Sequence, residues 1–190
     1  TEPSWSIRVL DDFSAGLERN LANLDVEIRG GSILDEKELG KVSNGVDTII
    51  HLAAIGSVPR SVAAPRPSHD ANATGTLNVL EAARTADVKN VIVASSSSVY
   101  GASPVMPRSE SDLARPLSPY AVTKLASEAY ANAYNASYGL PTLAFRFFNV
   151  YGPGERSDHA YAAVIPRFIS AALAGENLKV FGDGEQSRDF

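Results

Sequence analysis

Short apolar runs alternate with amphipathic or Ala-rich stretches along nearly the whole of this 190-residue chain. The runs have the length of buried strands, and the stretches between them are long enough to cross back over a sheet as helices. Strands that alternate with crossover helices form a parallel, doubly wound α/β sheet, which is the predicted fold. The predicted strands are 7–10, 26–28, 48–52, 91–94, 142–147 and 178–181. The predicted helices are a short one from residue 17, then 35–41, 70–86, 118–138 and 160–173.

The composition is that of a globular protein without a metal or nucleic-acid site. The chain is 44% hydrophobic and 21% charged, and its net charge of −5 argues against a nucleic-acid partner. It has no cysteine and three histidines, so we expect no disulfide and no metal ion. No apolar run approaches the roughly 20 residues that span a bilayer, and the N-terminus lacks the pattern of a secretory leader. We therefore expect a cytoplasmic protein without a membrane partner.

Tyr120 and Lys124 stand four residues apart in the helix predicted over 118–138, so their side chains share one face. A phenol ordinarily loses its proton near pH 10, and a neighbouring ammonium lowers that pKa. The pair can therefore supply a general base near neutral pH. Because the chain has seven tyrosines, the spacing also arises by chance, and an exposed helical Tyr and Lys is the alternative interpretation.

Polar and small residues follow the predicted strands at their carboxyl ends, where open parallel sheets bind ligands. Asp11 could accept hydrogen bonds from an adenosine ribose, which would favour NAD over NADP, or Asp11 and Asp12 could only form a turn. Ala53 and Ala54 could let a flat cofactor approach the backbone, or could only permit close helix packing. The serines at 95–98 could carry chemistry or lie solvated in a loop. No glycine-rich phosphate turn occurs in the chain.

Seven stretches, in this order, resemble the extended short-chain dehydrogenase/reductase family, and within it the nucleotide-sugar epimerases and dehydratases. One of the seven is Tyr120 with Lys124. The others are VLDDFS at 9–14, HLAA at 51–54, NATGT at 72–76, ASSSSVYG at 94–101, RFFNVYGP at 146–153 and FGDGEQSRDF at 181–190. The resemblance covers nearly the whole chain and implies a Rossmann-like fold with NAD as the cofactor.

The resemblance also implies where the chain sits in a longer protein. Residues 1–150 would form the NAD-binding domain without its first strand and glycine-rich turn, and residues 151–190 would begin a substrate-binding region. Family members carry that strand before the one predicted here at 7–10, and they continue past residue 190. We therefore expect an interior segment with two open sheet edges, which by itself binds NAD poorly.

By the resemblance, the protein is a UDP-sugar 4-epimerase, an NAD-dependent isomerase of carbohydrate metabolism. Tyr120 would be the base, Lys124 would lower its pKa and hold the nicotinamide ribose, and Ser96 would bond the reacting sugar hydroxyl. Ser97 and Ser98 occupy positions where dehydratases carry an Asp-Glu pair, which favours epimerisation through a 4-keto sugar. The alternatives are a uronate epimerase, a dehydratase or an oxidoreductase of the family, or a non-catalytic fragment.

Two sets of binding residues follow from the resemblance. The expected NAD-binding set is Asp11, Asp12, Ser14, Ser32, Ile33, Leu52, Ala53, Ala54, Asn72, Ala94, Tyr120, Lys124 and Phe147. The expected substrate-binding set is Ser57, Ser96, Ser97, Tyr120, Asn149, Val164, Phe181 and Arg188. Arg188 would bond a diphosphate oxygen of the UDP-sugar, or would only pair with Asp189 at the surface. Stretches 54–61 and 160–166 resemble the branch that accepts UDP-N-acetylhexosamines, and the long helix would join a homodimer in the complete protein.

Overall fold

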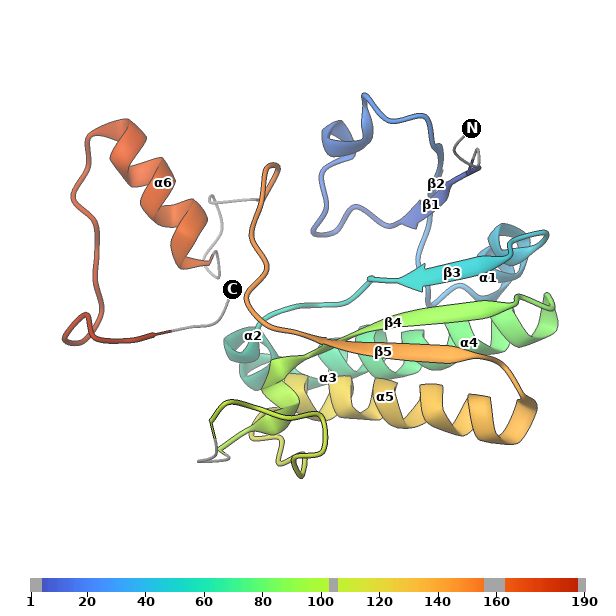
Figure 1. Cartoon of the computed structure of the whole chain (residues 1–190). Coiled ribbons are helices and arrows are strands. Elements are labelled where there is room, and N and C mark those ends of the chain that lie inside the picture. Colours follow the sequence, from blue (N-terminus) through green and yellow to red (C-terminus); the bar gives the residue numbers. More distant parts are fainter. Residues whose placement is uncertain (1–4, 103–105, 156–162, 188–190) are drawn as a thin grey trace. The chain divides into compact units, whose positions relative to one another are not determined.

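The computed structural model describes residues 5–102, 106–155 and 163–187. The chain divides into two compact units, Thr1–Arg146 and Phe147–Phe190. The strands of the described residues are β1 (Arg8–Asp11), β2 (Glu27–Gly30), β3 (Thr48–His51), β4 (Asn90–Ser96) and β5 (Thr142–Phe147) (Figure 1). The α-helices are α1 (Glu36–Ser43), α2 (Val58–Ala63), α3 (Pro65–His69), α4 (Gly75–Thr85), α5 (Pro119–Tyr138) and α6 (Val164–Ala174). Two 3-10 turns, η1 (Glu18–Leu21) and η3 (Ser97–Tyr100), and a π turn, η2 (Asp70–Thr74), complete them.

Helices α4 and α5 cover one face of the three-stranded sheet β3-β4-β5 (Figure 1). Burial alternates along β4 with the period of a strand, so that Val91 and Val93 point into the core. Leu80 of α4 packs in the same core cluster, and its side chain is completely buried. This packing holds α5 against the strand whose carboxyl end carries the serine run.

The described strands form two sheets because β1 pairs only with β2, while β3 pairs with β4. Both pairs are parallel, with Asp11 opposite Gly30 and His51 opposite Val93. Strands β1 and β3 each have an edge without a strand partner among the described residues. The prediction that the chain lacks a central strand and is part of a longer protein stays a prediction.

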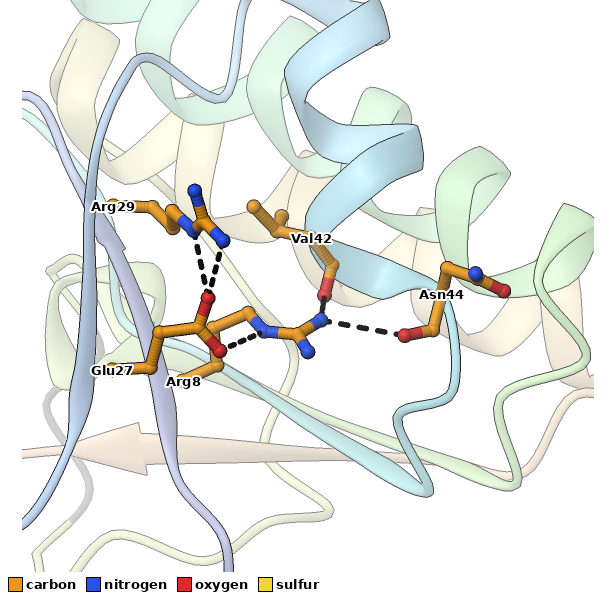
Figure 2. Close-up of polar contacts among 5 residues, drawn as sticks. All are labelled: Arg8, Glu27, Arg29, Val42 and Asn44. Carbon is orange, nitrogen blue, oxygen red and sulfur yellow. Dashed lines mark hydrogen bonds and ion pairs between the residues drawn. The ribbon is translucent and has the colours of Figure 1, made fainter.

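A cluster of charged side chains fastens the sheet β1-β2 to helix α1 (Figure 2). The Glu27 carboxylate lies between two guanidinium groups, 2.9 Å from Arg8 Nε and 2.6 Å from Arg29 Nη2. Hydrogen bonds from these arginines lower the pKa of Glu27. Arg8 Nη1 also donates to the carbonyl oxygens of Val42 (2.6 Å) and Asn44 (3.3 Å). Because these carbonyls lie at the C-terminal end of α1, Arg8 satisfies acceptors that the helix itself leaves unpaired.

Local signals explain the bounds of the longest helix. Ser118 is the N-cap of α5 and accepts a hydrogen bond from the Ala121 amide at 3.1 Å. Pro119 occupies the first turn, where its missing N–H has no helical partner to lose. Gly139 ends the helix with a φ of 68°, a conformation that glycine adopts without strain. The predicted helix 118–138 is therefore confirmed almost residue for residue.

The sequence analysis missed helices α2 and α3. Pro59 and Pro65 lie in their first turns, where proline begins helices, although the same residues resemble helix breakers in a sequence. Ser57 caps α2 by accepting a hydrogen bond from the Arg60 amide at 3.2 Å. The predicted helix at 70–86 begins as the π turn η2 and continues as α4.

The second unit contains α6, which ends at Gly175 with a φ of 69°. Residues 160–162 of the predicted helix lie outside the described residues. The strand predicted at 178–181 is wrong, because these residues form no strand in the structure. No neighbouring strand pairs with them in the described part of the chain, and the Phe181 carbonyl accepts a hydrogen bond from the Gln186 side chain. Among the helices described, none combines the length and hydropathy needed to cross a membrane.

Candidate active site

One face of α5 meets the carboxyl end of β4. Lys124 is buried, and its Nζ donates to the Ala94 carbonyl at 2.7 Å. The Tyr120 side chain, one turn earlier, interacts with the Ser96 side chain, and this interaction lowers the Tyr120 pKa. The structure therefore brings Ala94, Ser96, Tyr120 and Lys124 together, and it rules out the interpretation of the pair as an exposed helical Tyr and Lys.

The pKa values of this pair differ from the prediction. Burial raises the pKa of Tyr120, and the hydrogen bond with Ser96 opposes that shift. Burial lowers the pKa of Lys124 to about 8. We expected the Lys124 ammonium to lower the pKa of Tyr120, but desolvation dominates here and Lys124 is not among the causes of the shift. The hydrogen bond that lowers this pKa comes from Ser96 instead.

The serine run is partly buried, which excludes the alternative of a solvated loop. Ser95 is buried, whereas Ser96, Ser97 and Ser98 are half-buried. Ser96 caps the 3-10 turn η3, and its Oγ accepts hydrogen bonds from the Ser98 amide at 3.2 Å and the Ser98 hydroxyl at 2.9 Å. Ser98 therefore holds the Ser96 oxygen in place beside Tyr120.

Asn72 fastens the loop after β3 to helix α5. Its Oδ1 accepts from the Ile55 amide at 2.7 Å, and its Nδ2 donates to the Ile55 carbonyl at 3.2 Å and to Thr123 Oγ1 at 3.0 Å. The side chain is fully buried, so these bonds occupy it. Asn72 thus places the short segment with Ala53 and Ala54 against the helix of the candidate base. A direct contact of Asn72 with a cofactor stays a prediction.

His51, the last residue of β3, is a buried neighbour of this site. Its Nε2 lies 3.0 Å from Thr76 Oγ1, which in turn lies 3.0 Å from Ser127 Oγ. Burial lowers the pKa of His51 to about 4, and the positive charge of Lys124 adds to the shift. The imidazole is therefore neutral at pH 7, and the hydrogen bond to Thr76 can be made without a second buried charge.

The low pKa of His51 makes the stability of the fold depend on pH in acid. Above pH 6.5 both the folded and the unfolded chain keep His51 neutral, so this residue adds no pH dependence. Between pH 6.5 and pH 4 only the unfolded chain binds a proton at His51. The free energy of unfolding therefore falls by about 2 kcal/mol between pH 6.5 and pH 5. We expect urea unfolding of the His51→Gln variant to show a correspondingly smaller loss of stability between pH 7 and pH 5. Parallel pH curves for the two proteins would contradict a buried neutral His51.

The two acidic residues at the end of β1 form a turn, the alternative that the sequence left open. Asp11 Oδ1 accepts a hydrogen bond from the Phe13 amide at 2.7 Å, and Asp12 Oδ1 accepts one from the Ser14 amide at 2.9 Å. Hydrogen bonds from Ser14 lower the pKa of Asp12. A Cβ added to Gly16 would lie 3.2 Å from Asp11 Oδ2, so the carboxylate lies close against a glycine backbone. The turn fixes Asp11 at the strand end and leaves its predicted ribose contact a prediction.

The other predicted cofactor residues of the first unit have visible structural roles. Ser32 Oγ accepts from the Leu34 amide at 3.2 Å. Ile33 packs on Gly75, where a Cβ would approach its Cδ1 to 2.4 Å. Leu52 and Ala53, which follow β3, are exposed. The exposed Ala53 after β3, a carboxylate at the end of β1 and a buried amine on α5 fit the nucleoside and nicotinamide portions of NAD. The chain has no glycine-rich turn for the phosphates of NAD.

The remaining predicted site residues divide between the two units. Ser57 caps α2 in the first unit, as described above. Phe147, Asn149, Val164 and Phe181 belong to the second unit. Arg188 lies outside the described residues. The contacts of these residues with cofactor or substrate stay predictions, as does the division of roles between residues 1–150 and 151–190.

Two residues that support the site, Ser61 and Glu128, were not predicted from the sequence, and the partner of Ser95 was not predicted either. Ser61 of α2 is completely buried, and its Oγ accepts a hydrogen bond from the Tyr120 amide at 3.0 Å. Glu128 of α5 and Ser95 of β4 are buried and bonded to each other. For Glu128 a signal was present, because it lies four residues beyond Lys124 on the face that carries Tyr120. Nothing in the sequence identifies Ser61, whose partner is 59 residues away.

A model of the NAD dependent epimerase/dehydratase family matches residues 3–190. The chain belongs to this family. A UDP-glucose 4-epimerase of Mycolicibacterium smegmatis (strain ATCC 700084 / mc(2)155) is 40% identical over 187 residues, which are 95% of this chain and 59% of that protein. The UDP-N-acetylglucosamine 4-epimerase from Methanobrevibacter ruminantium M1, solved in complex with UDP-N-acetylmuramic acid, superposes with a TM-score of 0.93 at 42% identity. That match covers 97% of this chain and 60% of the solved one.

A third member of the family was solved with the cofactor. The UDP-glucose 4-epimerase from Brucella ovis in complex with NAD has a TM-score of 0.79 and 31% identity, covering 90% of this chain and 54% of that one. The parallel strand pairs and these structures confirm the Rossmann-like α/β fold. This epimerase/dehydratase family member spans less than two thirds of the length of these relatives.

Proposed function

We propose that the complete protein, of which we expect this chain to be a segment, is an NAD-dependent UDP-sugar 4-epimerase. It would invert C4 of a UDP-hexose or UDP-N-acetylhexosamine through a 4-keto sugar. The observation that carries the proposal is the meeting of Tyr120, Lys124 and Ser96 where α5 faces the end of β4. Relatives named as UDP-glucose and UDP-N-acetylglucosamine 4-epimerases support the choice of reaction.

The residues of the site would divide the work as follows. Tyr120 accepts the proton of the sugar 4-hydroxyl, and the half-buried Ser96 hydroxyl orients that oxygen. NAD, when bound, would supply the hydride acceptor and donor for C4, so that the hydride could be returned to the opposite face of the sugar. The Lys124 amine bonds the nicotinamide ribose, while Asp11 bonds the hydroxyls of the adenosine ribose. The ammonium also favours the Tyr120 phenolate once the substrate excludes water from the site.

The absence of an acid beside Ser96 favours epimerisation over dehydration. Elimination of water needs a group that can protonate the leaving hydroxyl. Ser97 and Ser98 follow Ser96, and the Ser98 hydroxyl donates to Ser96 Oγ. Serine hydroxyls do not donate a full proton near pH 7, so the neighbours of Ser96 suit a reaction in which the sugar keeps all its oxygens.

We also propose a substrate, an oligomeric state and a location for the complete protein. The substrate would be a UDP-sugar, and no nucleic acid or membrane would take part. The long helix α5 would join a homodimer of the complete protein in the cytoplasm. The exposed apolar side chain of Val122 supports a protein contact on that helix.

Product analysis tests the reaction directly. The complete protein is incubated with NAD and, separately, with UDP-glucose, UDP-N-acetylglucosamine and UDP-glucuronate, and the sugars are identified by NMR. We expect the C4 epimer of UDP-glucose or of UDP-N-acetylglucosamine, without a change in mass and without accumulation of NADH. A product lighter by one water, release of CO2, or stoichiometric NADH would instead assign a dehydratase, a decarboxylase or an oxidoreductase. Conversion of UDP-glucuronate alone would assign a uronate epimerase.

A further inference from the structure

Three successive residues of β4 each interact with one face of α5. Lys124 donates to the Ala94 carbonyl, and the Tyr120 side chain interacts with Ser96. Between them, Ser95 Oγ donates to Glu128 Oε1 at 2.5 Å. Tyr120, Lys124 and Glu128 follow one another at intervals of four residues, so they form one stripe about 12 Å long on the helix. The strand end and the helix thus interact at every residue from Ala94 to Ser96.

Glu128 is the member of the stripe that also reaches a second strand. Its Oε1 accepts from Arg146 Nε at 2.9 Å, and its Oε2 accepts from Arg146 Nη2 at 2.8 Å. Both side chains are largely buried, with 10% of Glu128 and 19% of Arg146 exposed. A bidentate ion pair at such a site has a fixed geometry, because the planar guanidinium and carboxylate groups join through two parallel hydrogen bonds. The hydrogen bond to Glu128 raises the pKa of Arg146.

Arg146 also contacts the turn η3, which follows β4. Its guanidinium carbon lies 4.7 Å from the centre of the Tyr100 ring, in η3, and its Nη1 lies 3.5 Å from the Glu110 carbonyl. Residues 97–100 form the 3-10 turn that Ser96 caps. One carboxylate therefore connects α5 with the ends of two strands and, through Arg146, with the turn that holds Ser96.

We propose that Glu128 is a positioning residue for the reaction, which holds the 94–96 strand end in register with α5 so that Ser96 meets Tyr120. This inference rests on the proposed function. Glu128 touches no reacting atom in this account, since it lies two helical turns from Tyr120 and both its oxygens are bonded. Its effect is geometric. Displacement of a catalytic group by about 1 Å can lower a rate by about a hundredfold.

Two variants separate positioning from mere stability. Glu128→Gln leaves Arg146 without its carboxylate, so it also weakens the fold. Ser95→Ala keeps the ion pair and all charges, and removes only the bond between Glu128 and β4. The matched control is Glu81→Gln on α4, whose carboxylate also pairs with an arginine, Arg84 at 2.9 Å, and accepts from a tyrosine hydroxyl. That tyrosine, Tyr134, is 14 residues from Tyr120, about 21 Å along the helix.

The experiment measures kcat, KM and the pH profile of the complete protein, together with the NMR titration of the Tyr120 ring carbon, assigned by comparison with Tyr120→Phe. We expect kcat to fall about 30-fold in Glu128→Gln and about fivefold in Ser95→Ala, with KM within threefold of the original value. In Ser95→Ala the rising limb of the pH profile and the Tyr120 titration should both move to higher pH, because the hydrogen bond from Ser96 lowers that pKa. Glu81→Gln should change neither.

The proposal is overturned if Ser95→Ala leaves kcat and the Tyr120 titration unchanged, or if Glu81→Gln alters them as strongly. Restoration of most of kcat by Glu128→Asp, compared with Glu128→Gln, would support it, since a carboxylate can still pair with Arg146. If the original protein shows no turnover, the proposed function fails. The Tyr120 titration then still decides whether Glu128 positions this face of α5.

Discussion

Replacement of Tyr120 by Phe is expected to lower kcat of the complete protein by about three orders of magnitude. The substitution removes one oxygen, the one that accepts the sugar proton, and general acid–base groups typically contribute 10²–10⁴-fold. The aromatic ring keeps its packing, so we expect NAD affinity within about threefold of the original and an unchanged fold. Steady-state kinetics and an equilibrium NAD titration check the two parts of this prediction.

Tyr130→Phe is the matched control for this substitution. Tyr130 lies ten residues further along the same helix and is exposed, with 38% of its surface accessible. The same oxygen is removed there without a bond to Ser96, so kcat should stay within twofold. Substantial turnover by Tyr120→Phe, or an equal loss in Tyr130→Phe, would show that the base is another group.

Replacement of Lys124 by Met is expected to lower kcat by at least about a hundredfold without lowering stability. The ammonium that favours the phenolate and bonds the cofactor ribose is lost. Burial lowers the pKa of Lys124 from 10.5 to about 8, so the folded chain holds this charge at a disadvantage at pH 7. The disadvantage is about 3 kcal/mol, from which the lost hydrogen bond to the Ala94 carbonyl subtracts about 1–2 kcal/mol. Urea unfolding at pH 7 should therefore show an equal or greater free energy of unfolding.

The sign of this effect depends on pH. Below pH 8 both folded and unfolded chains carry the charge, and the stability gained in Lys124→Met is complete. Between pH 8 and 10.5 the folded chain releases the proton first, so the gain disappears as pH rises through this window. Lys41→Met is the control, because Lys41 is 70% exposed and pairs with Glu38 at the surface. A marked loss of stability in Lys124→Met at pH 7 would contradict the buried, desolvated amine.

The parts of the fold that sequence predicted are those with local signals. Helix α5 has a capping serine, a first-turn proline and a terminal glycine, and strand β5 was predicted with the bounds that the structure shows. The predicted strand at 178–181 failed because a strand is defined by its partner, which no local pattern supplies. Helices α2 and α3 were missed because their prolines resemble breakers.

In the candidate site, too, features with a local signal were predicted from the sequence, and contacts between distant residues were not. The spacing of Tyr120 and Lys124 predicted that they share a face of α5, and the structure confirms that both lie at the end of β4. The direction of the Tyr120 pKa could not be predicted, because it depends on burial by segments far apart in the chain. The partners of Glu128 are 18 and 33 residues away, so its role became visible only in the structure.

The central claim is that Tyr120 removes the proton of the sugar 4-hydroxyl while the hydrogen on C4 moves as a hydride to NAD and back. The most direct measurement follows a UDP-hexose labelled with deuterium at C4 through turnover in ordinary water. The account predicts that the epimerised product keeps the deuterium at C4, because the cofactor returns the hydride that it took. A product that carries solvent hydrogen at C4 would contradict it, since the label would then have left as a proton.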